Sequence, residues 1–403
     1  MTKRQTRLKS PDYPFMIIVA ALTFIGVIMV YSATYVWSYE DHGHPYYFFL
    51  RQLLWLALGS IVMLVMMNIE YHRWQRLSLP IMGGAVLALI ALLLVGPETN
   101  GARRGFFSGS VQPSELAKLA MVIYVANWLS SKGGRIRQVS YGLIPFGILV
   151  GLVAGLIMLQ PDLSTSFLVM TTALAMFFIA GGDLVQLVTS GAFGGFIVGL
   201  MIIGSEWRLD RLEGWLDPCS DSTDTNYQIC RILTALREGG PFGQGLASIH
   251  KTVGYIPASH TDSIFAIVGN DFGLMGCLAL IGLFACLAYR GVKVALQAPD
   301  TFGAVLATGV TCWISFQALV NVASATSSIP YTGIPLPFIS FGGSSLLSTM
   351  AGVGLLLNVS RGTKKKEGPQ HASLDLGWRN GRSRLSGPRH RRGLRGQPGQ
   401  VRA

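Results

Sequence analysis

The sequence predicts an all-α polytopic membrane protein of about ten transmembrane helices, with one long external loop and a basic C-terminal tail. Half of the 403 residues are hydrophobic and only 13% are charged, whereas soluble domains carry about 25% charged residues. Apolar runs of roughly 20 residues, enough to cross ~30 Å of hydrocarbon, recur along the chain. These runs are continuous rather than alternating, which argues against an outer-membrane β-barrel.

The distribution of Lys and Arg orients the apolar runs, because cytoplasmic loops are enriched in these residues. The first 13 residues hold four Lys/Arg, and three of the connecting segments hold two or three each, whereas the alternate connections mostly hold none. Both termini are therefore expected in the cytoplasm, and the first run is interpreted as a membrane anchor rather than a cleaved signal. The ten expected spans are 14–33, 47–67, 79–96, 114–130, 141–159, 163–181, 184–204, 264–289, 301–322 and 342–360.

The net charge of +12 comes mainly from the tail, residues 361–403, which holds 12 Lys/Arg and two Asp/Glu. This Gly- and Pro-rich segment has too little apolar surface to fold. We expect a disordered cytoplasmic tail held near anionic lipid headgroups. Nothing resembling a nucleic-acid-reading module accompanies it, so no nucleic-acid partner is expected.

The long external loop is expected over residues 205–263. It contains Cys219 and Cys230, 11 positions apart, which would form a disulfide in an oxidising exterior; two free thiols are an equally open alternative. The stretch Gly239–Gly245 holds four glycines. These glycines suit either a close approach of backbone to a ligand or a plain re-entrant turn.

The end of this loop carries the candidate catalytic residue. In the stretch Tyr255-Ile-Pro-Ala-Ser-His-Thr-Asp262, the loop re-enters the membrane at Asp262. A carboxylate at the rim of a low-dielectric site is one that can be tuned to take up a proton. Asp262 is therefore the candidate base, with His260 and Thr261 beside it as candidate substrate-binding residues.

Two further motifs place ionisable groups at membrane depth. Glu115 and Lys118 lie three apart, on one helical face, and form either a helix-stabilising ion pair or the lining of a polar cavity near the outer surface. Asp162, in Gln160-Pro-Asp162, either caps the following helix or contacts substrate. Glu115, Lys118 and Asp162 are all candidate substrate-binding residues.

Non-helical backbone is expected before the last span, in Gly333–Ser345, which is rich in Pro, Gly and Ser. Such backbone at membrane depth is tolerated only where it is buried in protein or lines a cavity. The segment is therefore either a second wall of the same site, with Ser340 and Ser344 as candidate ligands, or a structural helix break.

Arginines on the outer side are candidate ligands for an anionic partner. Arg103 and Arg104 lie in the short external loop 97–113, Arg51 lies at the outer end of the second span, and Arg211 lies in the long loop. The alternative for each is an arginine that reaches the lipid headgroups.

Four of these motifs occur in an order that resembles the SEDS (shape, elongation, division and sporulation) family, which includes RodA and FtsW. The resemblance covers about residues 12–361. It departs from the common pattern at Ala258, Ser263, Asn270-Asp271 and Gly105, which bears on fine geometry, partner choice and metal requirement. The motifs are Gln112-Pro-Ser-Glu-Leu-Ala-Lys118, Gln160-Pro-Asp162, His260-Thr-Asp262 and Pro335-Leu-Pro-Phe-Ile-Ser-Phe-Gly-Gly-Ser-Ser345.

The resemblance implies an inverting peptidoglycan glycosyltransferase that polymerises lipid II at the outer face of the bacterial cytoplasmic membrane. It also implies a class B penicillin-binding protein as partner, with other division or elongation proteins, and Asp262 as the catalytic carboxylate. The sequence shows no dedicated metal cage; a divalent cation, Mg²⁺ or Mn²⁺, is compatible with the pyrophosphate chemistry. The alternatives are a lipid II flippase and a non-catalytic scaffold.

Overall fold

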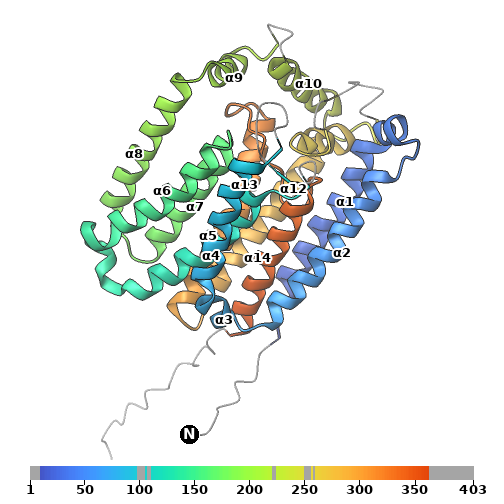
Figure 1. Cartoon of the computed structure of the whole chain (residues 1–403). Coiled ribbons are helices and arrows are strands. Elements are labelled where there is room, and N and C mark those ends of the chain that lie inside the picture. Colours follow the sequence, from blue (N-terminus) through green and yellow to red (C-terminus); the bar gives the residue numbers. More distant parts are fainter. Residues whose placement is uncertain are drawn as a thin grey trace, which may run out of the picture. The chain divides into compact units, whose positions relative to one another are not determined.

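The computed structural model describes residues 10–97, 105–106, 110–219, 224–248, 256 and 259–362. Within these residues the chain is helical apart from turns, irregular connections and one isolated bridge between Phe106 and Val111. The arrangement is shown in Figure 1. The helices are α1 (Tyr13–His42), α2 (Tyr47–Asn68), α3 (Tyr71–Arg76), α4 (Ser78–Val95), α5 (Pro113–Lys132), η1 (Gly133–Arg137), η2 (Val139–Leu143), α6 (Ile144–Met158), α7 (Leu163–Ile179), α8 (Leu184–Ile203), α9 (Glu206–Leu216), α10 (Asp224–Gly239), α12 (Ile264–Leu296), α13 (Thr301–Ala325) and α14 (Gly343–Arg361).

The all-α membrane fold expected from the sequence is confirmed. Eight of the described helical segments are long and apolar enough to cross a membrane. Of the remaining expected spans, α7 is a shorter apolar helix of 17 residues and α5 is a helix of 20 residues that carries Glu115 and Lys118. The chain is thus a multi-pass membrane protein, while the count of ten and the side on which the termini lie stay predictions.

Helix α14 forms the centre of the bundle, with 17 of its 19 residues buried. It packs against α2, α13, α5 and α12. Close approach to α2 depends on Gly354, because a Cβ there would lie 2.5 Å from the backbone oxygen of Met63. Small residues allow helix backbones to approach in this way inside membranes.

The glycine-rich stretch 239–245 docks against a break in α12. Gly273 interrupts this helix with a φ of +67°, a conformation that glycine adopts at little cost. The amide of Gln244 donates to the backbone oxygen of Asn270 (2.9 Å), and the amide of Leu274 donates to that of Gly240 (2.9 Å). These glycines therefore approach the backbone of α12. This agrees with the interpretation of the stretch as a plain re-entrant turn.

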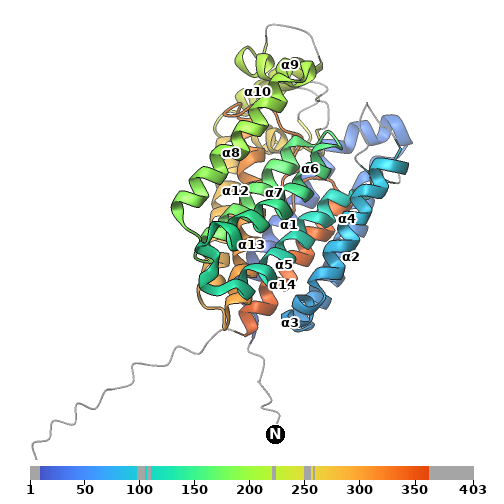
Figure 2. The ribbon, with the colours of Figure 1, turned by 60° about the vertical axis from the view of Figure 1, so that its left-hand side comes forward.

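The expected external loop, 205–263, contains two helices that the sequence-based prediction did not foresee, α9 and α10; that the segment lies outside the membrane stays a prediction. Figures 1 and 2 show both helices at one end of the bundle. The buried residues Ile229, Ile232 and Ala235 of α10 recur every third position, which gives the helix an apolar stripe, and α10 packs on α12. A disulfide joins Cys219 to Cys230, so the alternative of two free thiols does not hold.

Three sequence-based predictions fall on residues outside the described ranges. They concern Arg103, Arg104 and all of the C-terminal tail beyond residue 362.

Candidate active site

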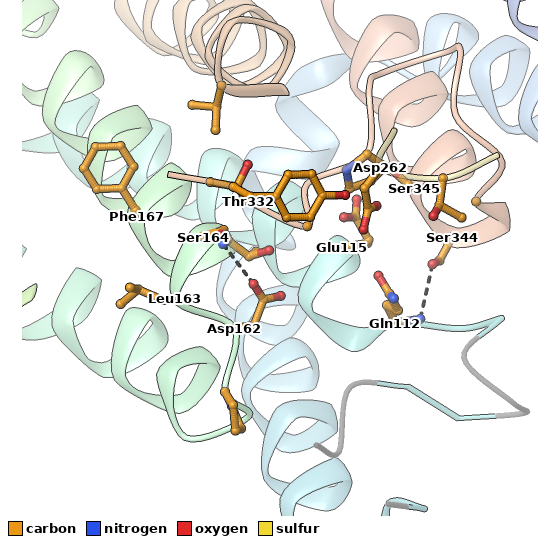
Figure 3. A pocket seen from close by; sticks show the side chains of 18 of the residues that line it. Gln112, Glu115, Asp162, Leu163, Ser164, Phe167, Asp262, Thr332, Ser344 and Ser345 are labelled. Atoms are coloured by element: carbon orange, nitrogen blue, oxygen red, sulfur yellow. Dashed lines mark hydrogen bonds between the residues drawn. The ribbon is translucent and has the colours of Figure 1, made fainter. Parts of the chain in front are cut away.

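A cavity of about 630 Å³ lies among α2, α5, α7, α8, α9, α13 and α14. Figure 3 shows that Glu115, Asp162 and Asp262, from three separate parts of the chain, lie on its walls. The turn before α12 and the non-helical segment before α14 complete the lining. The candidate residues on this lining are Arg51, Glu115, Asp162, Arg211, His260, Thr261, Asp262 and Ser344.

The backbone that carries Asp262 is anchored at three successive carbonyl groups. The carbonyl of His260 accepts from the amide of Phe341 (2.8 Å), and that of Thr261 accepts from the hydroxyl of Ser340 (2.6 Å). The carbonyl of Asp262 accepts from Nδ2 of Asn321 (2.9 Å). The candidate base therefore stands on a turn that is tied both to α13 and to the segment before α14.

The carboxylate of Asp262 lies close against the backbone of the opposite wall. A Cβ at Gly333 would lie 3.2 Å from Oδ2 of Asp262, a separation tighter than an ordinary van der Waals contact. Glycine at this position leaves room for the carboxylate. Any side chain here would push Asp262 away or distort the wall.

The ring of His260 packs in an aromatic cluster. Its centroid lies 4.9 Å from that of Trp37, 5.3 Å from that of Phe48 and 5.6 Å from that of Phe341. Burial lowers the pKa of His260 to about 4, because the charged imidazolium loses hydration there. His260 is therefore a neutral ring at neutral pH and contributes no positive charge to the cavity.

Glu115 and Lys118 form a buried ion pair, with Nζ of Lys118 2.8 Å from Oε1 of Glu115 and both side chains 3% exposed. Nζ of Lys118 also donates to Oε1 of Gln317 (2.9 Å) and lies 5.4 Å from the ring centroid of Trp313. Glu115 reaches the cavity lining, whereas Lys118 lies behind it. The ion-pair interpretation is thus correct, and the expected cavity lining holds for Glu115 but not for Lys118, whose donors are used inside the protein.

Asp162 caps a helix, as one of its two interpretations held, and contact with substrate stays a prediction. Its Oδ1 accepts from the amide of Thr165 (3.0 Å), which caps the first turn of α7. The same residue lines the cavity. The cap satisfies one of the free amides at the helix start and fixes where the carboxylate lies.

The segment before α14 is a cavity wall, as one of the two interpretations held. Ser344 lines the cavity, and its Oγ accepts from the amide of Gln112 (3.2 Å). Ser340 does not line it: its hydroxyl accepts from the amide of Leu336 (2.8 Å) and donates to the carbonyl of Thr261. The expectation that Ser340 contacts substrate is therefore corrected: both hydrogen bonds of its hydroxyl stabilise the wall itself.

Two arginines bring positive charge to the cavity. Arg51 donates to Oγ of Ser110 (3.2 Å) and lies over the rings of Tyr47 and Phe341, 5.6 and 6.0 Å from their centroids. Arg211 reaches the lining from α9. Because guanidinium groups match phosphate oxygens in geometry and charge, these two side chains suit a phosphorylated ligand.

Three residues of the site escaped the sequence-based prediction. Tyr331 lines the cavity, and its phenol accepts from Nε2 of Gln228 (2.7 Å). Its pKa is raised, first by burial and then by the negative charge of Asp262. Gln317 and Asn321 lie behind the wall, one turn apart on α13. The sequence could have indicated these two residues, because polar side chains four positions apart in an apolar span usually face the interior of the helix bundle.

The carboxylates of Glu115, Asp162 and Asp262 are ligands of the type that Mg²⁺ and Mn²⁺ prefer. However, Glu115 is engaged by Lys118 and Asp162 caps α7. Within the described ranges, no group of three or more His, Cys, Asp or Glu side chains is arranged to hold a metal ion. These residues do not form a dedicated cage, and a divalent cation stays an untested prediction.

The fold and the site define a class of protein: a helical membrane protein with a cavity that both carboxylates and arginines line. The family model described as "Cell cycle protein", which groups FtsW, RodA and SpoVE, matches residues 13–365. The chain belongs to this family, so the resemblance seen in the sequence is confirmed.

Individual relatives cover nearly the whole match. The probable peptidoglycan glycosyltransferase FtsW of Trichlorobacter lovleyi is 35% identical over 90% of this chain and 96% of its own length. The stage V sporulation protein E of Bacillus subtilis is 39% identical over 88% of this chain and 98% of its own length.

Solved structures show the same fold. A chain from work on the coordination of polymerization and crosslinking by a peptidoglycan synthase complex aligns with a TM-score of 0.72 at 28% identity, covering 87% of this chain and 98% of that one. The rod shape determining protein RodA of Thermus thermophilus aligns with a TM-score of 0.65 at 28% identity, covering 88% and 98%.

Proposed function

We propose that this protein is a peptidoglycan glycosyltransferase that polymerises lipid II, with Asp262 as the general base. The observation that carries the proposal is the placement of Asp262 on an anchored turn in a cavity that arginines and a broad apolar surface also line. The family membership and the names of the relatives support the same reaction.

The reaction requires a sugar hydroxyl to attack an anomeric carbon that bears a pyrophosphate. Asp262 takes the proton of the attacking hydroxyl as the new C–O bond forms, a contribution of typically 10²- to 10⁴-fold. The bond from the anomeric carbon to the pyrophosphate oxygen breaks, and the pyrophosphate leaves with the electron pair. A single displacement of this kind inverts the anomeric configuration.

The leaving pyrophosphate needs positive charge. Arg51 and Arg211 are the lining residues that provide it, since charge-assisted hydrogen bonds to phosphate are strong. Glu115 is held by Lys118, so its negative charge is largely compensated and does not repel the pyrophosphate. The neutral ring of His260 lines the cavity without adding charge.

The lipid portion of the substrate fits the other side of the cavity. Phe167 of α7 and Val198 and Ile202 of α8 line it there. These apolar side chains match a polyprenyl chain, and α8 stands at the edge of the helix bundle in Figure 1. In this arrangement the lipid chain stays in the bilayer while the sugar and pyrophosphate reach the carboxylate in the polar part of the cavity.

The proposal includes the cellular setting. The protein acts in the cytoplasmic membrane with both termini in the cytoplasm, as the Lys/Arg distribution indicates. Its partner is a class B penicillin-binding protein that crosslinks the glycan, in division or elongation. The relative studied as part of a peptidoglycan synthase complex supports such a partnership.

The test is lipid II polymerisation by the purified protein in liposomes, with and without its class B partner. Asp262→Asn keeps the shape of the side chain and removes its basicity, so glycan strands are expected to fall at least about 100-fold. Unchanged binding of lipid II and unchanged thermal unfolding are the controls for folding. Wild-type polymerisation by a well-folded Asp262→Asn variant would refute the base assignment. No strands from the wild type with a bound partner would refute the polymerase itself.

A further inference from the structure

Helix α13 presents two buried amide side chains to the back of the active-site walls. Gln317 and Asn321 are 0% and 1% exposed, and neither lines the cavity. Gln317 accepts from Lys118 and donates to the backbone oxygen of Pro335 (2.9 Å). Asn321, one turn further on, makes a different pair of contacts.

Both protons of the Asn321 amide are used on two facing segments. Nδ2 donates to the backbone oxygen of Asp262 (2.9 Å) and to that of Ile334 (2.8 Å). The two acceptors are 72 positions apart in sequence, and both lie in segments without regular structure. A single planar group therefore links the turn that carries the carboxylate to the wall opposite it, at Asp262 itself and next to Gly333, beside the bonds that Ser340 and Phe341 make between the same two segments.

The two segments held by Asn321 are the ones that meet at the carboxylate. Ile334 directly follows Gly333, and a Cβ at Gly333 would lie 3.2 Å from Oδ2 of Asp262. A shift of either segment by a few tenths of an ångström changes this contact. Because the backbone on both sides is non-helical, no helical hydrogen-bond ladder holds the separation independently.

We propose that Asn321 is a positioning residue that sets the spacing between Asp262 and the Gly333 wall. This inference rests on the proposed role of Asp262 as base. Asn321 acts through Asp262: it keeps the carboxylate at the depth from which it reaches the attacking hydroxyl. A misplacement of about 1 Å at a reacting group costs on the order of 100-fold in rate, so one amide side chain outside the cavity controls turnover.

The first experiment compares Asn321→Leu and Asn321→Asp with wild type in full-length protein bound to its partner. Leu has a similar volume and no donors, while Asp keeps the shape and replaces the donors with an acceptor. We expect kcat for lipid II polymerisation to fall about 10- to 100-fold, with KM within about threefold, because substrate contacts are unchanged.

Ser324→Ala is the matched control. The hydroxyl of Ser324, three positions further on α13, accepts from the amide of Thr332 (2.8 Å). It anchors the same wall without contacting Asp262, and its removal is expected to change kcat by less than about threefold. An equal loss of kcat in Ser324→Ala and Asn321→Leu would overturn the proposal, since general anchoring of the wall would then explain both.

A double-mutant cycle with Gly333→Ala measures the coupling between the two sites in kcat. A purely structural role of Asn321 would give no such coupling. Gly333→Ala pushes on the carboxylate most strongly while Asn321 holds Asp262 and Ile334 together, because the bonds of Ser340 and Phe341 join the two segments at other residues. We therefore expect its kcat penalty to shrink at least about threefold in the Asn321→Leu background, which is a coupling between the two sites. If the fold losses of kcat in the two single variants simply multiply in the double variant, the proposal is overturned.

The outcomes separate this inference from the proposed function. If Asp262→Asn retains activity, the base assignment fails whatever Asn321 does. If Asp262→Asn is inactive and Asn321→Leu and Asn321→Asp are as active as wild type, the inference alone fails. If neither Asn321 variant yields a folded protein that binds lipid II, Asn321 is a general structural residue and the inference is also overturned.

Discussion

Helices α14 and α8 both contribute to the cavity, yet they are held in opposite ways. In α14, 17 of 19 residues are buried, whereas in α8 only Gln186 among the described side chains is buried. α14 supplies Ser344 and Ser345 to the lining, and α8 supplies Val198 and Ile202. The polar, chemically active wall is thus enclosed by protein, while the apolar wall exposes its outer face to the bilayer.

This difference indicates that the two walls have different functions: one holds catalytic groups in place and the other accommodates a lipid chain. Catalytic groups need fixed positions, and buried hydrogen bonds from α13 and the α5 ion pair provide them. A lipid chain needs only apolar surface and access from the bilayer, which a helix with a lipid-facing side supplies. The wall formed by α5, α13 and α14 is therefore expected to be the more rigid of the two.

The largest effect is expected from breaking the buried ion pair. Lys118→Met leaves the carboxylate of Glu115 buried without its partner, and such a change costs about 3–5 kcal/mol in unfolding free energy. Thermal unfolding in detergent measures it. The double variant Glu115→Gln with Lys118→Met removes the uncompensated charge and is expected to recover most of the loss. A single variant as stable as wild type would contradict the idea that this pair stabilises the polar wall.

A smaller effect is expected from the close packing of α14 on α2. Gly354→Ala places a methyl group 2.5 Å from the Met63 backbone oxygen, and such overpacking costs about 1–3 kcal/mol. The matched control is Gly199→Ala in α8, where an added Cβ meets nothing within 4 Å. That control is expected to be neutral or stabilising by up to ~1 kcal/mol. Equal destabilisation of both variants would remove the contrast between the two helices.

The smallest effect concerns His260 and depends on pH. Its pKa in the folded protein, about 4, lies below the ordinary 6.5. Between these values the unfolded chain takes up a proton that the folded protein does not. The free energy of unfolding is therefore not reduced by this group above about pH 6.5, and it falls as the pH falls toward 4. A fall from pH 7 to pH 5 is expected to cost about 1–2 kcal/mol through this group.

His260→Phe keeps a ring among Trp37, Phe48 and Phe341 and removes the titration. Thermal unfolding at pH 7 and pH 5 is the measurement, and the variant is expected to lose less stability than wild type over that interval. An unchanged pH dependence would mean that His260 is hydrated rather than enclosed by its aromatic neighbours.

Much of the candidate site was predictable because the relevant signals are local. Asp262, Glu115 and Asp162 were identified as ionisable groups at membrane depth, and all three line one cavity. Lys118 and Ser340 were misplaced because their side chains point away from that cavity, and direction depends on neighbours far along the chain. The helices α9 and α10 were missed because a charged, polar segment was interpreted as a loop although its apolar residues recur at helical spacing.

The sequence alone determined that this chain is a helical membrane protein of a recognisable family. Apolar run length is a property of single segments, and the order of short motifs along the chain can be read without knowing how the segments pack. Only the tertiary structure decided which polar groups meet: that Asn321 bonds to both Asp262 and Ile334, that Gln317 receives Lys118, and that Gly333 makes room for a carboxylate. These contacts join residues dozens or hundreds of positions apart, and a hydrogen bond that requires about 3 Å exists only once helix packing has set that distance.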